Sequence, residues 1–157
     1  MNLWKINLFL KAYALIKLPL LAFVNPKIIE LEGSRSVVRI NLGYRTKNHL
    51  NVMYFGALAI GAELSIAIKA VQAIQASGQK IDFIFKDFKA EFLKRSDSHV
   101  HFVCEEANLV DQLIMNAKTS SDRMEKTFSG YAFVPTKGPD PVMKFQLTLS
   151  VKNRSKI

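Results

Sequence analysis

The pattern of hydrophobic and polar positions changes period twice along the chain, and each period predicts a different element. Residues 54–74 are apolar nearly all round, which is typical of a helix that lies inside a protein. Glu63 is the lone carboxylate in this run. Gly78 follows shortly after the apolar run, and a glycine at that place predicts the carboxyl-terminal cap of the helix. The sequence therefore predicts one long buried helix with a single acidic side chain near its centre.

Alternation with a period of two predicts strands on both sides of this helix. Before it, residues 28–31 and 38–42 predict two short strands. After it, residues 80–92 predict a longer strand whose apolar row slips by one position between Phe85 and Phe88, and such a slip indicates a bulge. The remaining expected elements are strands at residues 100–104, 128–134 and 143–151, and a short connection with some helical pattern at residues 108–119.

This order of elements indicates an α+β domain in which an antiparallel sheet packs against one long helix. Because a bulge bends a strand, we expect the sheet to curl around the helix, and that arrangement is the hotdog fold. The chain has 157 residues and no internal repeats, which suits a single domain. We expect residues 25–157 to form the hotdog domain and residues 1–24 to pack on it as an amphipathic helix.

The amino-terminal segment is strongly apolar but contains Lys5, Lys11 and Lys17. A membrane-spanning helix needs about 20 residues nearly free of charge, and a signal peptide needs an uninterrupted apolar stretch. Neither fits, and the pattern instead predicts an amphipathic helix that ends near Pro19. We expect it to pack on the protein, with contact to a membrane surface left open as the alternative. The expected location is the cytoplasm.

The net charge of +9 at pH 7 favours a negatively charged partner. Nucleic acid, an anionic membrane and a phosphate-bearing molecule such as coenzyme A all qualify, but the basic residues are spread along the chain, which disfavours nucleic acid. Cys104 is the only cysteine, so an internal disulfide is impossible. His99 and His101 share a strand face without a third ligand nearby in sequence. We therefore expect no metal and no cofactor.

The neighbours of Glu63 one turn away on the helix are all apolar, so no cation on the same helix is placed to pair with it. Three outcomes are open for such a carboxylate: a charged partner across the core, a raised pKa, or a position facing a cavity. The first is an ordinary structural ion pair, and a side chain that simply reaches solvent is the other ordinary alternative. A raised pKa or a position facing a cavity describes a functional site.

The segment 48–56 and Glu63 together resemble the active-site signature of hotdog thioesterases of the phenylacetate-degradation type. That family has an Asn, two residues, a Gly, two residues and then His-Gly-Gly at the start of the central helix, with an acidic residue further on. In this chain Asn48 stands for the Asn, Asn51 for the Gly, Tyr54 for the His, and Phe55 and Gly56 for the paired glycines. The chain after about Asn25 also resembles a less characterised hotdog branch of unknown function.

The resemblance implies an acyl-CoA or acyl-carrier thioesterase that works as a homodimer or a dimer of dimers. The free N–H groups at the start of the central helix would form an oxyanion hole. Glu63 lies about 13 Å further along the same helix at roughly 1.5 Å per residue, so the carboxylate of one subunit would meet the helix start of the other. Glu63 would activate water or attack directly, and Asn48 would orient the water or the carbonyl. The substrate-binding candidates are His49, Tyr54, Phe55 and Gly56.

Two other functions remain open. Tyr54 and Phe55 place two bulky rings where the family keeps open backbone, which favours a non-catalytic acyl-CoA-binding or scaffold protein. A basic protein that binds a membrane surface or nucleic acid would instead show a strong salt dependence of binding.

Overall fold

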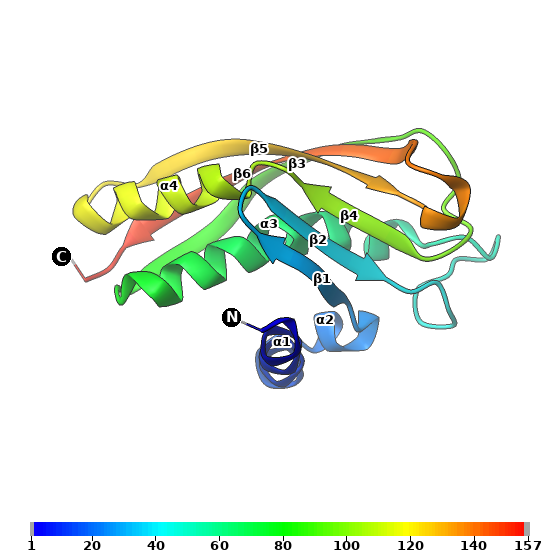
Figure 1. Cartoon of the computed structure of the whole chain (residues 1–157), viewed down its shortest axis with the longest axis horizontal. Helices are drawn as coiled ribbons and strands as arrows, with labels where there is room; N and C mark the ends of the chain where they lie inside the picture. Colours follow the sequence, from blue (N-terminus) through cyan, green and yellow to red (C-terminus); the bar gives the residue numbers. More distant parts are fainter. Residues whose placement is uncertain (1, 156–157) are drawn as a thin grey trace.

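The chain folds into one antiparallel sheet that curves around a long central helix, as the computed structural model shows for residues 2–155 (Figure 1). The helices are α1 (Leu3–Lys17), α2 (Pro19–Val24), α3 (Phe55–Ser77) and α4 (Ala107–Thr119). The strands are β1 (Lys27–Glu32), β2 (Arg35–Ile40), β3 (Ile81–Phe92), β4 (Val100–Cys104), β5 (Met124–Phe133) and β6 (Pro141–Asn153), with a short 3-10 turn η1 (Pro135–Lys137) before the last strand. The strand order β1-β2-β4-β5-β6-β3 leaves β1 and β3 at the two edges.

This architecture confirms the expected α+β hotdog fold. The bulge is where the slipped apolar row predicted it, because the pairing of β3 with β6 shifts register between Phe85 and Phe88. The helix cap is also confirmed: Gly78 ends α3 with a φ of 64°, in the left-handed region that favours glycine. The last two strands are longer than predicted, since β5 and β6 each begin before the alternation becomes clear.

Helix α3 fills the concave side of the sheet because its inward side chains are small or aliphatic. Ala57, Ala62, Ile66 and Ala70 are buried in the main core. At Gly61 the missing side chain leaves room for the ring of Phe102 from β4, which is fully buried. By length and composition α3 would suit a membrane span, yet more than half of its most apolar stretch is buried in the protein.

The connection expected at residues 108–119, with its partly helical pattern, is the 13-residue helix α4. Val110, Leu113, Ile114 and Ala117 are buried at spacings of three and four, which is the pattern of a helix with one apolar face. Helix α4 packs on α3, where Lys69 Nζ lies 3.0 Å from an oxygen of Asp111. The one cation of α3 is thus paired with an acid of its neighbour.

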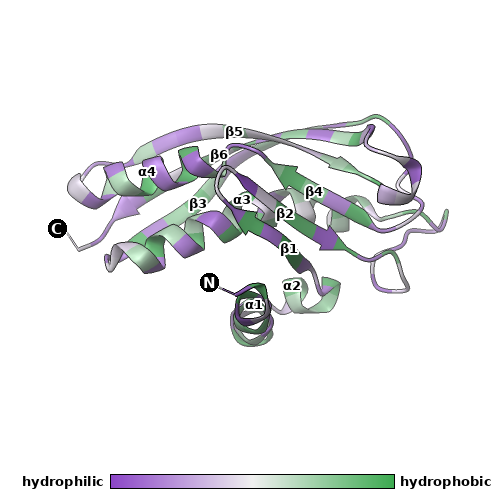
Figure 2. Cartoon of the chain, viewed as in Figure 1, coloured by the Kyte–Doolittle hydropathy of each residue, from purple (hydrophilic) through white to green (hydrophobic). Residues whose placement is uncertain are grey.

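The amino-terminal segment forms two helices instead of one, because Pro19 opens α2 after it ends α1. Ile6, Leu10 and Ala14 bury one stripe of α1. The side chain of Asn7 fixes the helix to β1: its amide nitrogen donates to the Ile28 carbonyl and its oxygen accepts from the Ile28 N–H, both at 2.8 Å. Hydrophobic residues nevertheless continue around α1 and along α2 (Figure 2).

Replacing Gly61 by alanine is expected to destabilise the protein by about 1–3 kcal/mol, since the added methyl group would overlap the buried Phe102 ring. The matched control is Gly56→Ala in the first turn of the same helix. There the new methyl group would meet only the half-exposed ring of Tyr54, which can swing aside. Urea unfolding of both variants checks this. Equal stabilities for the two variants would contradict the close packing of α3 on β4.

Candidate functional site

Glu63 is the one exposed residue in an otherwise mainly buried stretch of α3, and it opens to hollows on two sides. The first is a cavity of about 370 Å³ between α1, α2 and α3, in which Glu63 and Lys17 are the only charged lining residues. The second has about 320 Å³ and lies between α3 and the bulge of β3, next to Phe85 and Phe88. The carboxylate therefore lies where two mainly apolar spaces meet.

Of the outcomes that the sequence left open for Glu63, the structure excludes an ion pair among the described residues, and it leaves the side chain exposed to solvent. Within residues 2–155 no ion pair or hydrogen bond joins its carboxylate to another side chain. Desolvation by the surrounding apolar residues raises the pKa of Glu63 above its ordinary value. A raised pKa in a cavity, without a structural partner, is the combination that general bases have in active sites.

The start of α3 presents backbone N–H groups to the surface. Tyr54 is the N-cap in an extended conformation and its side chain makes no capping hydrogen bond. The first N–H groups of a helix have no acceptor inside the helix, and the helix dipole makes this end favourable for negative charge. The ring of Tyr54 fills the space where a side chain on Gly56 would lie. Tyr54 and Phe55 are each 56% exposed.

The loop before α3 is built by its own asparagines. Asn51 has a φ of 59°, and asparagine tolerates this left-handed conformation better than most residues other than glycine. This explains why Asn51 can stand where the thioesterase signature has a glycine. The oxygen of Asn48 accepts hydrogen bonds from the N–H groups of Leu50 (2.8 Å) and Val52 (3.3 Å) and so holds the loop. His49 is exposed.

The candidate residues therefore fall into two groups. Asn48, Tyr54 and Gly56 lie around the start of α3, while Glu63 lies about two turns further along, roughly 12 Å from Phe55 at 1.5 Å per residue. A single carbonyl group is too small to contact both groups in one subunit. The signature residues are thus close in sequence but not gathered into one site within the chain.

The open edge of the sheet connects the two groups. Phe88 and Phe92 of β3 lie on the helix-facing side, yet they are 37% and 46% exposed because β3 has no neighbouring strand there. The rings of Phe92 and Phe55 are 5.6 Å apart, so the end of β3 lies beside the start of α3. Phe88 lines the hollow that holds Glu63.

The sequence pattern did not predict the residues that α1 and α2 contribute to the cavity at Glu63. Phe9, Tyr13 and Lys17 line the larger cavity at Glu63, although they are about 50 positions away in the chain. Their apolar character was visible in the sequence. Their position against α3 depends on tertiary packing, which no local pattern reports.

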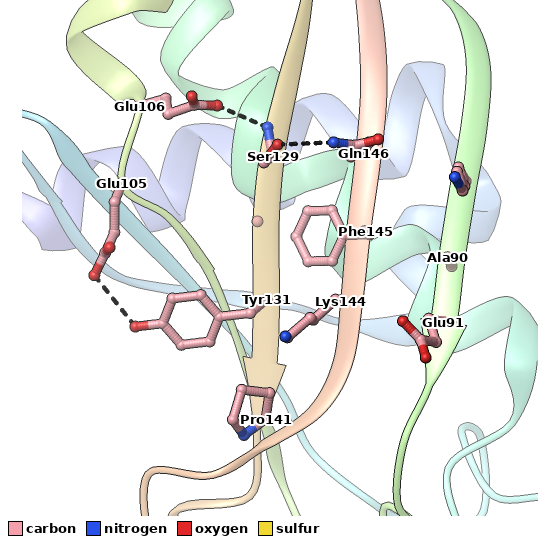
Figure 3. Close-up of a pocket in the computed structure, with 12 residues that line it drawn as sticks. Ala90, Glu91, Glu105, Glu106, Ser129, Tyr131, Pro141, Lys144, Phe145 and Gln146 are labelled. Atoms are coloured by element: carbon pink, nitrogen blue, oxygen red, sulfur yellow. Dashed lines mark hydrogen bonds between the residues drawn. The ribbon is translucent and has the colours of Figure 1, made fainter.

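Another hollow lies on the outer face of the sheet (Figure 3). It has about 560 Å³, and some of the polar groups in its lining bond to one another. The Glu106 carboxylate accepts from the Ser129 N–H at 2.7 Å, and the Tyr131 hydroxyl donates to Glu105 at 3.2 Å. Because these groups satisfy each other and lie on the opposite side of the sheet from α3, we do not place the chemistry there.

Other reactive side chains have structural roles. Within residues 2–155 no three His, Cys, Asp or Glu side chains are grouped as metal ligands. His99 Nδ1 accepts a hydrogen bond from the Leu42 N–H at 3.1 Å. Burial raises the pKa of the Cys104 thiol to about 11, so at neutral pH it stays protonated and is a poor nucleophile.

Comparisons with known proteins agree with this geometry. Residues 7–128 match the model of a family described as a domain of unknown function, DUF4442. Among solved structures, a Chlorobaculum tepidum protein of unknown function is similar with a TM-score of 0.79 and 11% identity, over 96% of each chain. A thioesterase of Haemophilus influenzae has a TM-score of 0.69 and 15% identity, over 98% of this chain and 92% of its own.

A mutant thioesterase of Pseudomonas aeruginosa is similar with a TM-score of 0.68 and 14% identity, over 98% of this chain and 95% of its own. No curated protein matches the chain. At these identities the structural matches establish the hotdog fold, which this chain shares with thioesterases.

Glu63→Gln is expected to stabilise the fold at neutral pH. Because the folded-state pKa of Glu63 is raised, the native protein binds this proton more tightly than the unfolded chain does. The favourable contribution is complete below the ordinary pKa of 4.5 and is lost as the pH rises through the raised value. Melting temperatures of both proteins should therefore differ at pH 7 and converge near pH 4. A variant that is less stable than wild type at pH 7 would mean that Glu63 has a stabilising partner.

Proposed function

We propose that this chain, which belongs to the DUF4442 family, hydrolyses acyl thioesters of coenzyme A or an acyl carrier as a homodimer. One observation carries the proposal. Glu63 is a carboxylate without an ionic partner among the described residues, with a raised pKa, at a mainly apolar cavity on the central helix of a hotdog fold. The similarity of the fold to thioesterases of Haemophilus influenzae and Pseudomonas aeruginosa supports the reaction class.

In this proposal Glu63 acts as the general base. Its carboxylate takes a proton from water while the water oxygen bonds to the thioester carbonyl carbon. The carbonyl oxygen becomes an oxyanion, and the N–H groups at the start of an α3 helix stabilise it. The intermediate then collapses, the carbon–sulfur bond breaks, and the thiolate takes up a proton, which yields a carboxylic acid and a free thiol. The pKa of Glu63, raised by the desolvating apolar residues around it, makes this carboxylate a stronger base than a glutamate with the ordinary pKa.

A second subunit supplies the helix start in this proposal. An exposed edge strand of twelve residues with uncovered aromatic side chains is a surface that another strand readily joins. Pairing of β3 with β3 of a second copy would cover Phe88 and Phe92 and bring the two α3 helices side by side. The 12 Å separation within one chain then no longer matters, because Glu63 of one subunit faces the helix start of the other.

The cavity under α1 and α2 suits the acyl group. Its lining comes from apolar side chains of three helices and from Phe83 of β3, and burying each methylene of an acyl chain contributes about 0.8 kcal/mol. The positive net charge of the chain favours an anionic carrier such as coenzyme A or an acyl carrier protein.

A second candidate function is acyl binding without turnover. The observation that favours it is the ring of Tyr54, which occupies the space beside Gly56 where an oxyanion would approach the backbone. The two functions differ in one result: a binding protein retains an intact acyl-CoA, whereas an enzyme releases its thiol.

Glu63→Gln is expected to lower kcat for acyl-CoA hydrolysis at least about a hundredfold, the usual contribution of a general base. Free-thiol release from short, long and aromatic acyl-CoA esters measures it, and the wild-type rate should fall at low pH as Glu63 is protonated. Glu32→Gln on β1, an exposed glutamate at the far sheet edge, is the matched control and should keep full activity.

Unchanged turnover in Glu63→Gln would exclude Glu63 as the general base. Tight binding of acyl-CoA without thiol release by the wild type would instead establish the binding function.

Phe88→Lys is expected to convert the dimer into a monomer and to abolish turnover, because it places a charge on the uncovered helix-facing side of β3. Ile84→Lys is the matched control. Ile84 is on the same strand and 56% exposed, but it pairs with Ser150 on the outer face of the sheet. Sedimentation velocity should therefore give a dimer for Ile84→Lys. A wild-type monomer with full activity would contradict the composite site.

A further inference from the structure

The two amino-terminal helices expose an unusual amount of apolar surface. Nineteen large hydrophobic side chains are exposed in the described part of the chain, and nine of them lie between residues 4 and 23. These nine are Trp4, Leu8, Phe9, Tyr13, Leu15, Ile16, Leu18, Leu20 and Phe23. Helices α1 and α2 lie together at one side of the molecule, away from the main body of the sheet (Figure 1).

The exposed residues form a second apolar stripe on α1. The buried stripe of Ile6, Leu10 and Ala14 faces β1 and α3. Trp4, Leu8 and Leu15, at spacings of four and seven, lie together on the opposite side with the exposed Lys11 among them, and the three apolar side chains are 66%, 54% and 64% exposed. A helix that is apolar on opposite sides is stable when both sides contact apolar groups. In this chain β1 and α3 cover the inner side of α1, and the outer side is left exposed.

The charges near this stripe indicate what kind of partner would cover its exposed side. Lys5 and Lys11 of α1 and Lys27 of β1 are exposed, and no acidic residue precedes Glu30 in the sequence. Lysines beside exposed Trp, Phe and Leu are the composition of helices that lie in the interface of a membrane, and Trp and Tyr prefer that depth. A second copy of this face fits less well, because it would bring the same lysines together as like charges.

We propose that α1 and α2 dock the protein, lying flat, on an anionic lipid surface. The stripe of Trp4, Leu8 and Leu15 enters the boundary between headgroups and acyl chains, and the lysines contact the phosphate groups. The three lysines of α1 exclude a spanning orientation, since each would have to cross the hydrocarbon core. The proposal is independent of Glu63 and of any catalytic activity.

Trp4 is the only tryptophan of the chain and lies in the proposed contact, so its fluorescence reports docking directly. Vesicles of phosphatidylglycerol and phosphatidylcholine are expected to shift Trp4 emission to shorter wavelength and to sediment the wild-type protein. Vesicles of phosphatidylcholine alone should bind it much more weakly, and salt should weaken the binding to anionic vesicles.

Two double variants separate the apolar and the electrostatic contributions. Leu8→Gln with Leu15→Gln should weaken vesicle binding at least about tenfold, since both side chains lose their apolar contact. Lys5→Gln with Lys11→Gln should weaken binding to anionic vesicles by about 25-fold, or roughly fivefold for each lysine. Met115→Gln, an exposed apolar residue of α4, is the matched control and should bind like wild type.

Circular dichroism and melting temperatures establish that every variant is folded. Absence of a Trp4 shift with anionic vesicles would overturn the proposal. Equal binding to neutral and anionic vesicles would also contradict it, because the lysines would then have no role. A Trp4 shift that needs no lipid and grows with protein concentration would identify a second copy of the chain as the partner and so reject the lipid surface.

Discussion

The fold depends on one constraint: an apolar helix of 23 residues has to be covered along most of its surface. The sheet covers one side of α3, and the close approach at Gly61 lets Phe102 fill the contact. Helix α4 covers a second side, and α1 with β1 covers a third through Leu64 and Ile68. The side toward the free edge of β3 is the part left open, and Glu63 lies there.

Two charges on α3 illustrate what this constraint does to polar groups. Lys69 is nearly buried and is paired with Asp111 of α4, so its charge is compensated within the fold. Glu63 has no such partner in the described structure, and its ionised form is disfavoured. Charged side chains on a mainly buried helix are normally paired, and an unpaired one such as Glu63 is expected where a functional site requires it. The same reasoning joins the two proposals, because the open side of α3 and the outer stripe of α1 are both apolar surfaces that lack cover within this chain.

The sequence predicted the features that follow from the spacing of apolar residues along the chain. It did not predict the features that form only when distant segments pack together. The slip between Phe85 and Phe88 located the bulge, and the long apolar run located α3 with its unusual Glu63. Residues 108–119 show only a partly helical pattern, because polar residues interrupt the apolar positions of α4. Helix α2 was not predicted, because Pro19 ends α1 but also suits the first turn of a following helix. The cavity at Glu63 was not predictable, since it forms only when α1 and α2 fold back onto α3.

The measurement that tests the central claim most directly is subunit complementation. Glu63→Gln removes the carboxylate, and Gly56→Val blocks the helix start, so each variant alone should be inactive as a dimer. After subunit exchange half of the dimers are hybrids with one intact site of two, and thioesterase activity should recover to about a quarter of the wild-type level. No recovery, with subunit exchange verified by a mass tag on one variant, would contradict a site shared between two subunits.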